Sequence, residues 1–261
     1  MRFGCCAGVD KIAATQQAGF DYIEFPVAVV APERPESEFG PVYDEIRSHR
    51  ILAEAWNCLI PGDMKLTGPR VDSYRIERYL RTAFDRIARL GGKVVVFGSG
   101  GARSIPEGFD PTEGRRQILE FLALCSVVAA QRSLTIAIEP LNRKESNVIN
   151  SVAEGLEFAE LAAHPNVRVL ADLYHIDEEK EPLENTARAG VALAHAHTAD
   201  TGRFAPGTGS YDHVGFFHAL REAGYDERMS IECRWNDFDK EIGESLRFLR
   251  SVAEQVRLGN A

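Results

Sequence analysis

The chain has 261 residues, 44% of them hydrophobic, and its 30 lysines and arginines against 39 aspartates and glutamates give a net charge of −9. This negative balance argues against nucleic acid as a partner, because a phosphate backbone is bound through a basic surface. No apolar run approaches the roughly 18 residues that a membrane span requires, and no signal segment opens the sequence, so we expect a cytoplasmic protein without a membrane partner.

Short apolar runs alternate with helical patterns about every 30 residues, which is typical of repeated βα units. The helical patterns include residues 74–90, 112–130 and 242–256, where apolar side chains recur with a period near 3.6. Eight strands are predicted, at residues 3–6, 21–25, 51–55, 93–97, 134–138, 167–171, 191–195 and 229–231. No linker interrupts this order. The pattern therefore predicts an α/β fold in which residues 1–261 form a single (β/α)8 TIM barrel of parallel strands and outer helices.

The connections that follow strands differ from those that precede them. Residues 26–40, 57–72 and 98–110 are long and rich in proline and glycine, and each follows a predicted strand. The connections that lead into strands are brief. Long loops therefore gather at the carboxyl ends of the strands, where barrel enzymes carry their active sites.

Residues with metal-binding side chains end the last four predicted strands. They are Glu139, Asp172, His197 and Glu232. Each alone could be a solvated acid, a helix cap or a buried histidine, but four at successive strand ends favour a metal site. Three carboxylates and one imidazole suit one divalent ion, with Mn²⁺ favoured and Mg²⁺, Co²⁺ or Zn²⁺ as alternatives. His195 faces the same side of its strand as His197 but lies deeper, so we expect it to be buried or to support the ligands.

On these residues the chain resembles the xylose isomerase-like barrel superfamily, and within it the ketose 3-epimerases related to D-tagatose 3-epimerase. The matching segments are IEPLNRKE at 138–145, ADLYH at 171–175, HAHTADTGR at 195–203, PGTG at 206–209 and SIE at 230–232. The resemblance implies that Glu139, Asp172, His197 and Glu232 bind the ion and that the two glutamates also transfer protons. It further implies that Glu145, His175 and Arg203 contact oxygens of a small sugar substrate.

Two flanking carboxylates permit two outcomes. A dication that binds a carbonyl and the neighbouring hydroxyl stabilises the enediolate formed when the carbon-bound proton leaves. Return of a proton to the opposite face inverts the carbon, whereas return to the adjacent carbon interconverts an aldose and a ketose. We therefore predict a metal-dependent epimerase or isomerase, that is, an enzyme of the isomerase class acting on a keto-sugar or a sugar phosphate.

The N-terminal half offers weaker candidates for substrate contacts. Glu24 ends the second predicted strand and could bind a sugar hydroxyl. Trp56 and Asn57 follow the third strand and could cover one side of a sugar, although a core tryptophan is as consistent with the pattern. The glycine-rich run at 97–101 lacks the Lys-Ser/Thr ending of a nucleotide-binding loop, so close backbone approach to substrate is favoured.

Arg103, Arg115 and Arg143 are candidates to bind a substrate phosphate, or they face water. A homo-oligomer that pairs around the mouth of the barrel is a further expectation, with Phe216 and Phe217 as a contact if they are exposed.

The segment Cys233-Arg234-Trp235 departs from the small or apolar continuation expected after the last ligand in the epimerases. It leaves open a keto-inositol dehydratase or an oxidised-glycoside lyase on the same metal site, which the fold cannot separate. A barrel that binds sugar and metal without turnover is the alternative of another class. A DNA-repair endonuclease is remote, because seven histidines and a charge of −9 do not suit its metal set and basic groove.

Overall fold

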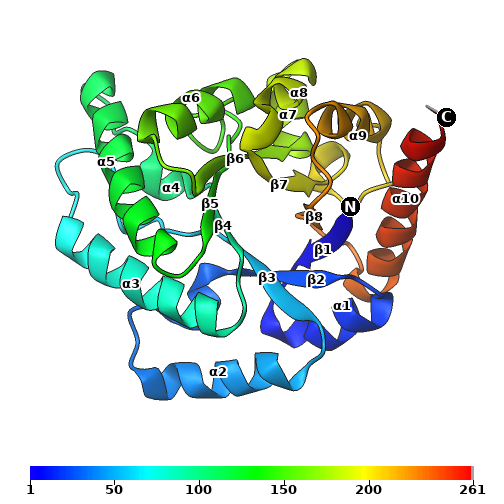
Figure 1. Ribbon diagram of the computed structural model, residues 1–261, viewed down its shortest axis with the longest axis horizontal. Coiled ribbons are helices and arrows are strands. Elements are labelled where there is room, and N and C mark those ends of the chain that lie inside the picture. Colours follow the sequence, from blue (N-terminus) through cyan, green and yellow to red (C-terminus); the bar gives the residue numbers. More distant parts are fainter. Residues whose placement is uncertain (260–261) are drawn as a thin grey trace.

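The computed structural model describes residues 1–259. Parallel strands close into a barrel in the order β1 to β8, and helices surround it (Figure 1). The strands are β1 Arg2–Cys6, β2 Tyr22–Pro26, β3 Leu52–Asn57, β4 Val94–Phe97, β5 Thr135–Ile138, β6 Val167–Asp172, β7 Leu193–Thr198 and β8 Arg228–Ile231. The predicted (β/α)8 TIM barrel is confirmed.

The outer layer consists of helices that follow the strands. They are α1 Ile12–Ala18, α2 Glu36–Ser48, α3 Ser73–Arg89, α4 Gly100–Arg103, α5 Pro111–Ala130, α6 Val152–Ala162, α7 Leu173–Glu179, α8 Glu184–Ala189, α9 His213–Glu222 and α10 Phe238–Leu258. The three helices predicted from periodicity are α3, α5 and α10. Helix α10 begins four residues before the predicted residue 242, because the Asp237 side chain accepts the backbone N–H of Lys240 and caps its first turn. None of the helices within residues 1–259 has the length and apolar character to span a bilayer.

Strand β7 differs from its predicted bounds of 191–195. Val191 is 92% exposed and belongs to a short 3₁₀ turn, Gly190–Ala192, that precedes the strand. Its β-branched side chain favours a strand, but the preceding Gly190 has a φ of 50° and turns the chain there. The strand begins at Leu193 and extends to Thr198, so both His195 and His197 lie within it.

Alternation along β3 decides which side chains enter the barrel. Ala55 belongs to the small cluster inside it, whereas the next residue, Trp56, packs in the layer between strands and helices. Trp56 is fully buried there, with its ring 5.4 Å from that of Phe25 and its Nε1 donating to Ala53 O at 3.1 Å. The expectation that Trp56 covers a sugar is therefore wrong. Phe216 and Phe217 are buried in the same layer, so they offer no exposed contact for an oligomer.

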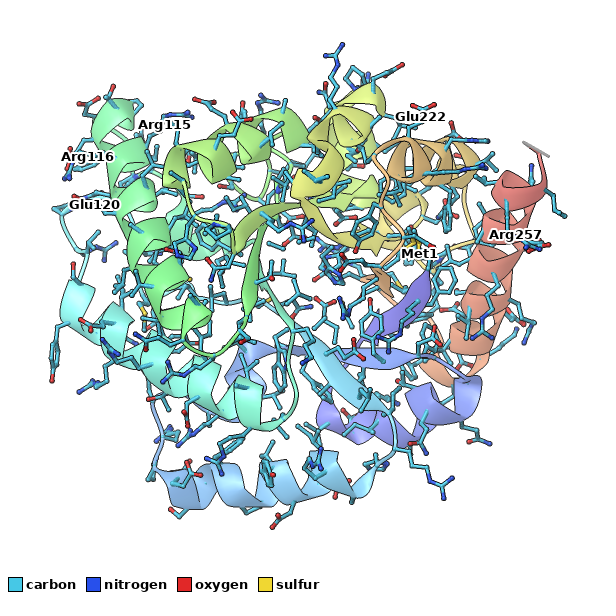
Figure 2. All side chains as sticks on the ribbon, in the orientation of Figure 1. Met1, Arg115, Arg116, Glu120, Glu222 and Arg257 are labelled. Carbon is cyan, nitrogen blue, oxygen red and sulfur yellow. The ribbon has the colours of Figure 1, made fainter. Side chains whose placement is uncertain are left out.

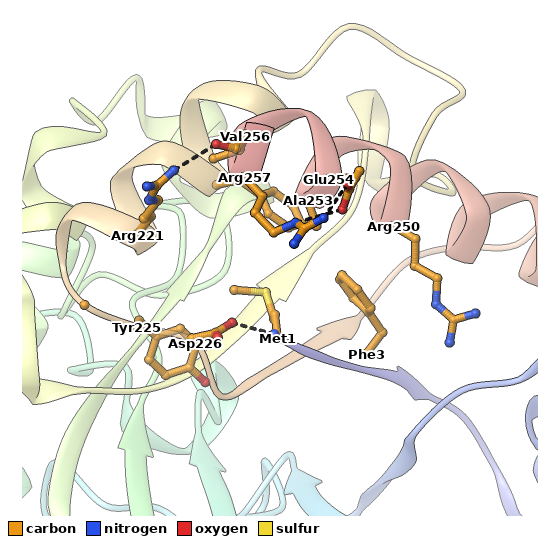
Figure 3. Close-up of a pocket in the computed structure, with 12 residues that line it drawn as sticks. Met1, Phe3, Arg221, Tyr225, Asp226, Arg250, Ala253, Glu254, Val256 and Arg257 are labelled. Atoms are coloured by element: carbon orange, nitrogen blue, oxygen red, sulfur yellow. Dashed lines mark hydrogen bonds and ion pairs between the residues drawn. The ribbon is translucent and has the colours of Figure 1, made fainter. Parts of the chain in front are cut away.

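The amino-terminal end of the barrel is closed by an ion-pair network. Glu54 accepts hydrogen bonds from the guanidinium groups of Arg2 and Arg228, each at 2.7 Å. A cavity of about 520 Å³ lies beside this end, lined by residues of β1, α9 and α10. Figure 3 shows the pairs of Arg257 with Glu254 and of Arg221 with Val256 O, and Arg250, also in the lining, donates to Gly19 O. This cavity lies apart from the predicted site, which is at the carboxyl ends of the strands.

Candidate metal centre and active site

The barrel brings the four predicted ligands together at the carboxyl ends of β5 to β8. Each offers one ligand atom, and these atoms lie within 4.8 Å of one another. We call this group the four-ligand cluster, and its members are Glu139, Asp172, His197 and Glu232. Neighbouring parallel strands place their ends side by side, which is why residues far apart in the sequence meet here.

His197 is the centre of the cluster. Its Nδ1 lies 3.2 Å from Glu139 Oε1 and 3.5 Å from Glu232 Oε2, and its Nε2 lies 2.9 Å from Glu24 Oε1. Burial lowers the pKa of His197, but the charge of Glu24 and the hydrogen bonds with Glu139 and Glu232 outweigh it, and the pKa is well above its usual value. When protonated, the ring can donate to carboxylates on both sides, from Nδ1 to Glu139 and from Nε2 to Glu24.

Asp172 fits the role of a ligand because one of its oxygens is left free. Its Oδ1 accepts the backbone N–H of Tyr174 at 2.9 Å, which caps α7. Its Oδ2 is buried and has no hydrogen-bond partner within the described residues. Burial raises the pKa of the carboxyl to about 7. A buried, unpaired carboxylate oxygen beside two more carboxylates and an imidazole fits a divalent cation.

The two glutamates of the cluster lie in different electrostatic surroundings. Burial would raise the pKa of Glu232, but the hydrogen bond to His197 and the charges of His197 and Arg203 lower it to about 2. The Nη2 of Arg203 donates to Glu232 Oε2 at 2.7 Å, and Asn57 Nδ2 donates to its Oε1 at 3.3 Å. Burial and the charge of Glu232 together raise the pKa of Glu139. The pKa values of the two carboxyls are thus shifted in opposite directions.

His175 points a donor into the site. Its Nδ1 accepts from the backbone N and from Nδ2 of Asn142, at 3.0 and 2.9 Å. The hydrogen of the neutral ring therefore sits on Nε2, which is buried and lacks a hydrogen-bond partner among residues 1–259. Burial, with the charge of Arg203, lowers the pKa of His175 to about 3, so the ring is neutral at pH 7. Asn142 lies inside the matched segment 138–145, but nothing in its spacing marked it as the anchor.

Arg203 bridges two acidic residues at the mouth. Besides Glu232, it donates from Nη1 to Glu145 Oε1 at 3.0 Å, and its guanidinium carbon lies 4.7 Å from the centre of the Tyr174 ring. Its backbone has a φ of 64°, in the left-handed region. The surrounding loop is held by the Asp200 carboxylate, which accepts the backbone N–H groups of Thr201, Gly207 and Tyr211 at 2.8 to 3.2 Å.

Glu24 does not face the mouth. It is fully buried inside the barrel, where both of its oxygens accept hydrogen bonds from other side chains. The expectation that Glu24 binds a sugar hydroxyl is therefore wrong, because no part of its carboxylate is open to a ligand. His195, one of its partners, is fully buried as predicted.

The glycine-rich run after β4 approaches the protein's own catalytic candidate. A Cβ at Gly98 would collide with Glu139 Oε2, so only glycine fits this position without displacing that carboxylate. Ser99 Oγ accepts the backbone N–H of Ile60 at 2.9 Å. The backbone at Gly98 thus approaches Glu139, and close approach to a substrate stays a prediction.

The three arginines predicted as candidates to bind a substrate phosphate all have partners outside the four-ligand cluster. Arg103 is fully buried and donates to the carbonyl oxygens of Phe97, Glu139 and Ile149, at 2.8 to 3.1 Å. It therefore ties the ends of β4 and β5 to the following loop. Arg115 lies on the side of α5 that faces α6 (Figure 2), where it stacks over the Phe158 ring and pairs with Glu157. Arg143 pairs with Glu179, away from the four-ligand cluster.

The segment Cys233-Arg234-Trp235, which follows Glu232, contributes a backbone hydrogen bond and side-chain packing at the rim of the barrel. The backbone N–H of Arg234 donates to Arg203 O at 2.6 Å, while the Arg234 side chain is exposed. Trp235 is half-buried and packs edge-on against Phe238, with ring centres 5.2 Å apart.

Comparisons with known proteins agree with this fold. The xylose isomerase-like TIM barrel family matches residues 12–252. An L-ribulose 3-epimerase of Methylomonas sp. strain DH-1 is 27% identical over 269 residues, covering 94% of this chain and 91% of that protein. A ketose 3-epimerase of Arthrobacter globiformis is 28% identical over 229 residues, covering 85% and 76%. The crystal structure of D-psicose 3-epimerase with D-tagatose, from Clostridium cellulolyticum H10, superposes with a TM-score of 0.85 over 97% of this chain and 99% of that one; at 21% identity it supports the fold alone.

Proposed function

The chain belongs to the xylose isomerase-like TIM barrel family, and from this premise we propose that it is a divalent-metal-dependent ketose 3-epimerase. The predicted isomerase class is confirmed, since the relatives are named as sugar epimerases. The observation that supports the proposal of a 3-epimerase is the pair Glu139 and Glu232. They reach one cluster from the ends of β5 and β8, and their pKa values are shifted in opposite directions.

The donor set fits a hard divalent cation, and we assign Glu139, Asp172, His197 and Glu232 as its ligands, with Mn²⁺ favoured. When bound, the ion would polarise a substrate carbonyl and stabilise the negative charge that develops on its oxygen. The assignment is supported by the free Asp172 Oδ2 and by the approach of His197 Nδ1 to both glutamates.

Glu232 and Glu139 divide the proton transfer between them. Glu232 is ionised under the influence of His197 and Arg203, so it suits the base that removes the proton from C3. Glu139, whose pKa is raised by burial and by the charge of Glu232, suits the acid that returns a proton to the other face. In the reverse direction the two exchange roles.

His175, Arg203 and Glu145 suit contacts to the oxygens of the sugar. The Nε2–H of His175 is the free donor nearest to Asp172 Oδ2, at 3.6 Å, and suits a substrate oxygen beside the ion. Arg203 and Glu145 pair with each other at the mouth, where a guanidinium and a carboxylate can bind hydroxyl groups from both sides. These contacts would fix the sugar so that its C3 lies between the two glutamates.

The test is hydrogen exchange at defined carbons. The Mn²⁺-loaded protein is incubated in D₂O with L-ribulose, D-psicose or D-fructose, and the recovered sugars are analysed by NMR. We expect deuterium at C3 together with the C3 epimer. Exchange at C1 with an aldose product would instead indicate an isomerase, and loss of water a dehydratase. Sugar binding without exchange would favour a non-catalytic barrel. If no ketose, free or phosphorylated, exchanged hydrogen, the proposal would be contradicted.

A further inference from the structure

A buried hydrogen-bonded group lies directly behind the four-ligand cluster, inside the barrel. Glu24 Oε2 accepts from His195 Nε2 at 2.7 Å and from Ser230 Oγ at 2.6 Å, and its Oε1 faces His197 Nε2 at 2.9 Å. All four residues are 0% exposed. Tyr22 OH lies 2.8 Å from Ser230 Oγ and can donate to it, which leaves the serine proton for Glu24.

This arrangement determines which nitrogen of His197 carries hydrogen. A carboxylate only accepts hydrogen bonds, so the ring must present an N–H at Nε2. A ring that binds an ion has lost one of its two protons; with the remaining N–H held at Nε2, the lone pair of Nδ1 points toward the side of the ring where Glu139 and Glu232 lie, 3.2 and 3.5 Å away. His195 and Ser230 hold the other oxygen of Glu24, so the carboxylate cannot turn away from His197.

We propose that Glu24 is a positioning residue that fixes the orientation and tautomer of His197, so that Nδ1 binds the divalent ion. This inference rests on the proposed metal-dependent function and assigns Glu24 a role that substrate contact does not explain. Histidines that bind metals commonly donate their second N–H to a carboxylate, and loss of that partner weakens metal binding. Because Glu24 is closed off from the mouth, its contact with the four-ligand cluster is the one to His197.

The experiment compares Mn²⁺ affinity, measured by titration with EPR detection of the free ion, for the wild type, Glu24→Leu and Glu24→Gln. Leucine removes both acceptor oxygens, and we expect binding about 10- to 100-fold weaker, the range for loss of such a partner. Glutamine keeps one acceptor oxygen and should lose less. Glu54→Gln is the matched control, since Glu54 is also a buried strand glutamate but pairs with Arg2 and Arg228 at the other end of the barrel. Its Mn²⁺ affinity should equal that of the wild type.

A folded Glu24→Leu protein that binds Mn²⁺ like the wild type would overturn the inference while leaving the proposed function intact. Absence of Mn²⁺ binding by the wild type would instead overturn the metal centre, and the role of Glu24 with it. If the Glu24 variants do not fold, nitrogen-15 NMR of the histidine-labelled, Mg²⁺-loaded wild type decides the matter. We expect His197 protonated at Nε2, and a ring protonated at Nδ1 would refute the inference.

Discussion

The two ends of the barrel use buried acidic residues in opposite ways. At the amino-terminal end Glu54 meets two arginines, and its charge is fully compensated. At the carboxyl end the three carboxylates of the four-ligand cluster meet His197 and Arg203, and within residues 1–259 both Asp172 Oδ2 and His175 Nε2 remain unpaired. A compensated charge can remain buried without a ligand, and breaking its pair is costly, whereas uncompensated charge at the strand ends suits a cation and a ligand.

We expect the largest effect, a loss of kcat, from a substitution at the carboxyl end of the barrel. Replacement of Glu232 by Gln removes the proposed base but keeps the size of the side chain, and kcat should fall about 10²- to 10⁴-fold, the range of general acid–base catalysis. Steady-state kinetics with the ketose that shows exchange measures this, and circular dichroism checks the fold. A loss smaller than about tenfold would remove Glu232 from the proton transfer.

A matching substitution at the amino-terminal end should lower the stability of the fold and leave kcat unchanged. Glu54→Gln leaves two arginines without their anionic partner. We expect the free energy of unfolding to fall by about 3 kcal/mol, the lower end for a broken buried pair, because Arg2 is partly exposed. Urea denaturation measures the loss. If kcat per folded molecule fell as well, the two ends would not be independent.

The pH dependence of ion binding sharpens the contrast at the mouth. The pKa of Asp172 is raised to about 7 by burial, and that of His197 is well above its usual value, so both hold protons that an ion must displace. Mn²⁺ affinity should therefore rise with pH through 7, by about tenfold per unit for each proton displaced. Calorimetry in two buffers of different ionisation enthalpy counts the protons released. Affinity that did not change between pH 6 and pH 8 would contradict this linkage.

The smallest effect is expected in the loop that carries Arg203. Asp200→Asn exchanges one acceptor oxygen for a donor where three backbone N–H groups converge, so the loop should loosen. We expect KM to rise about 5- to 10-fold, equivalent to the loss of one hydrogen bond, with kcat less affected. Asp212→Asn is the matched control, since Asp212 caps α9 through Gly215 N. An equal rise in KM for both variants would argue against a specific role of Asp200.

Much of the fold could be predicted because each strand is a short apolar run and each predicted helix has an apolar face. Errors arose where a local signal competed with a turn. Val191 favours a strand, yet Gly190 bends the chain and leaves Val191 exposed. The start of α10 was missed because its first turn rests on the Asp237 cap and carries few apolar residues.

The site was predictable to the extent that it depends on strand ends. The four candidate ligands meet because neighbouring parallel strands end at the same height, which a count of strands already implies. Trp56 and Glu24 were misassigned because their roles depend on which face of the strand they occupy. A register shift between β2 and β3, at Ile23 and Glu24, sets that alternation.

The sequence by itself determined the repeated βα architecture and the set of four candidate ligands, which follow from the hydrophobic period and from residue types at strand ends. Its motifs carry the resemblance to sugar epimerases. Only the tertiary structure decided how the ligands are held. Glu24 from β2 meets His197 from β7 across the barrel, and Asn142, in the loop after β5, meets His175 of α7. Such contacts join residues 33 to 173 positions apart, and they exist only once the barrel closes and withholds water from the groups it brings together.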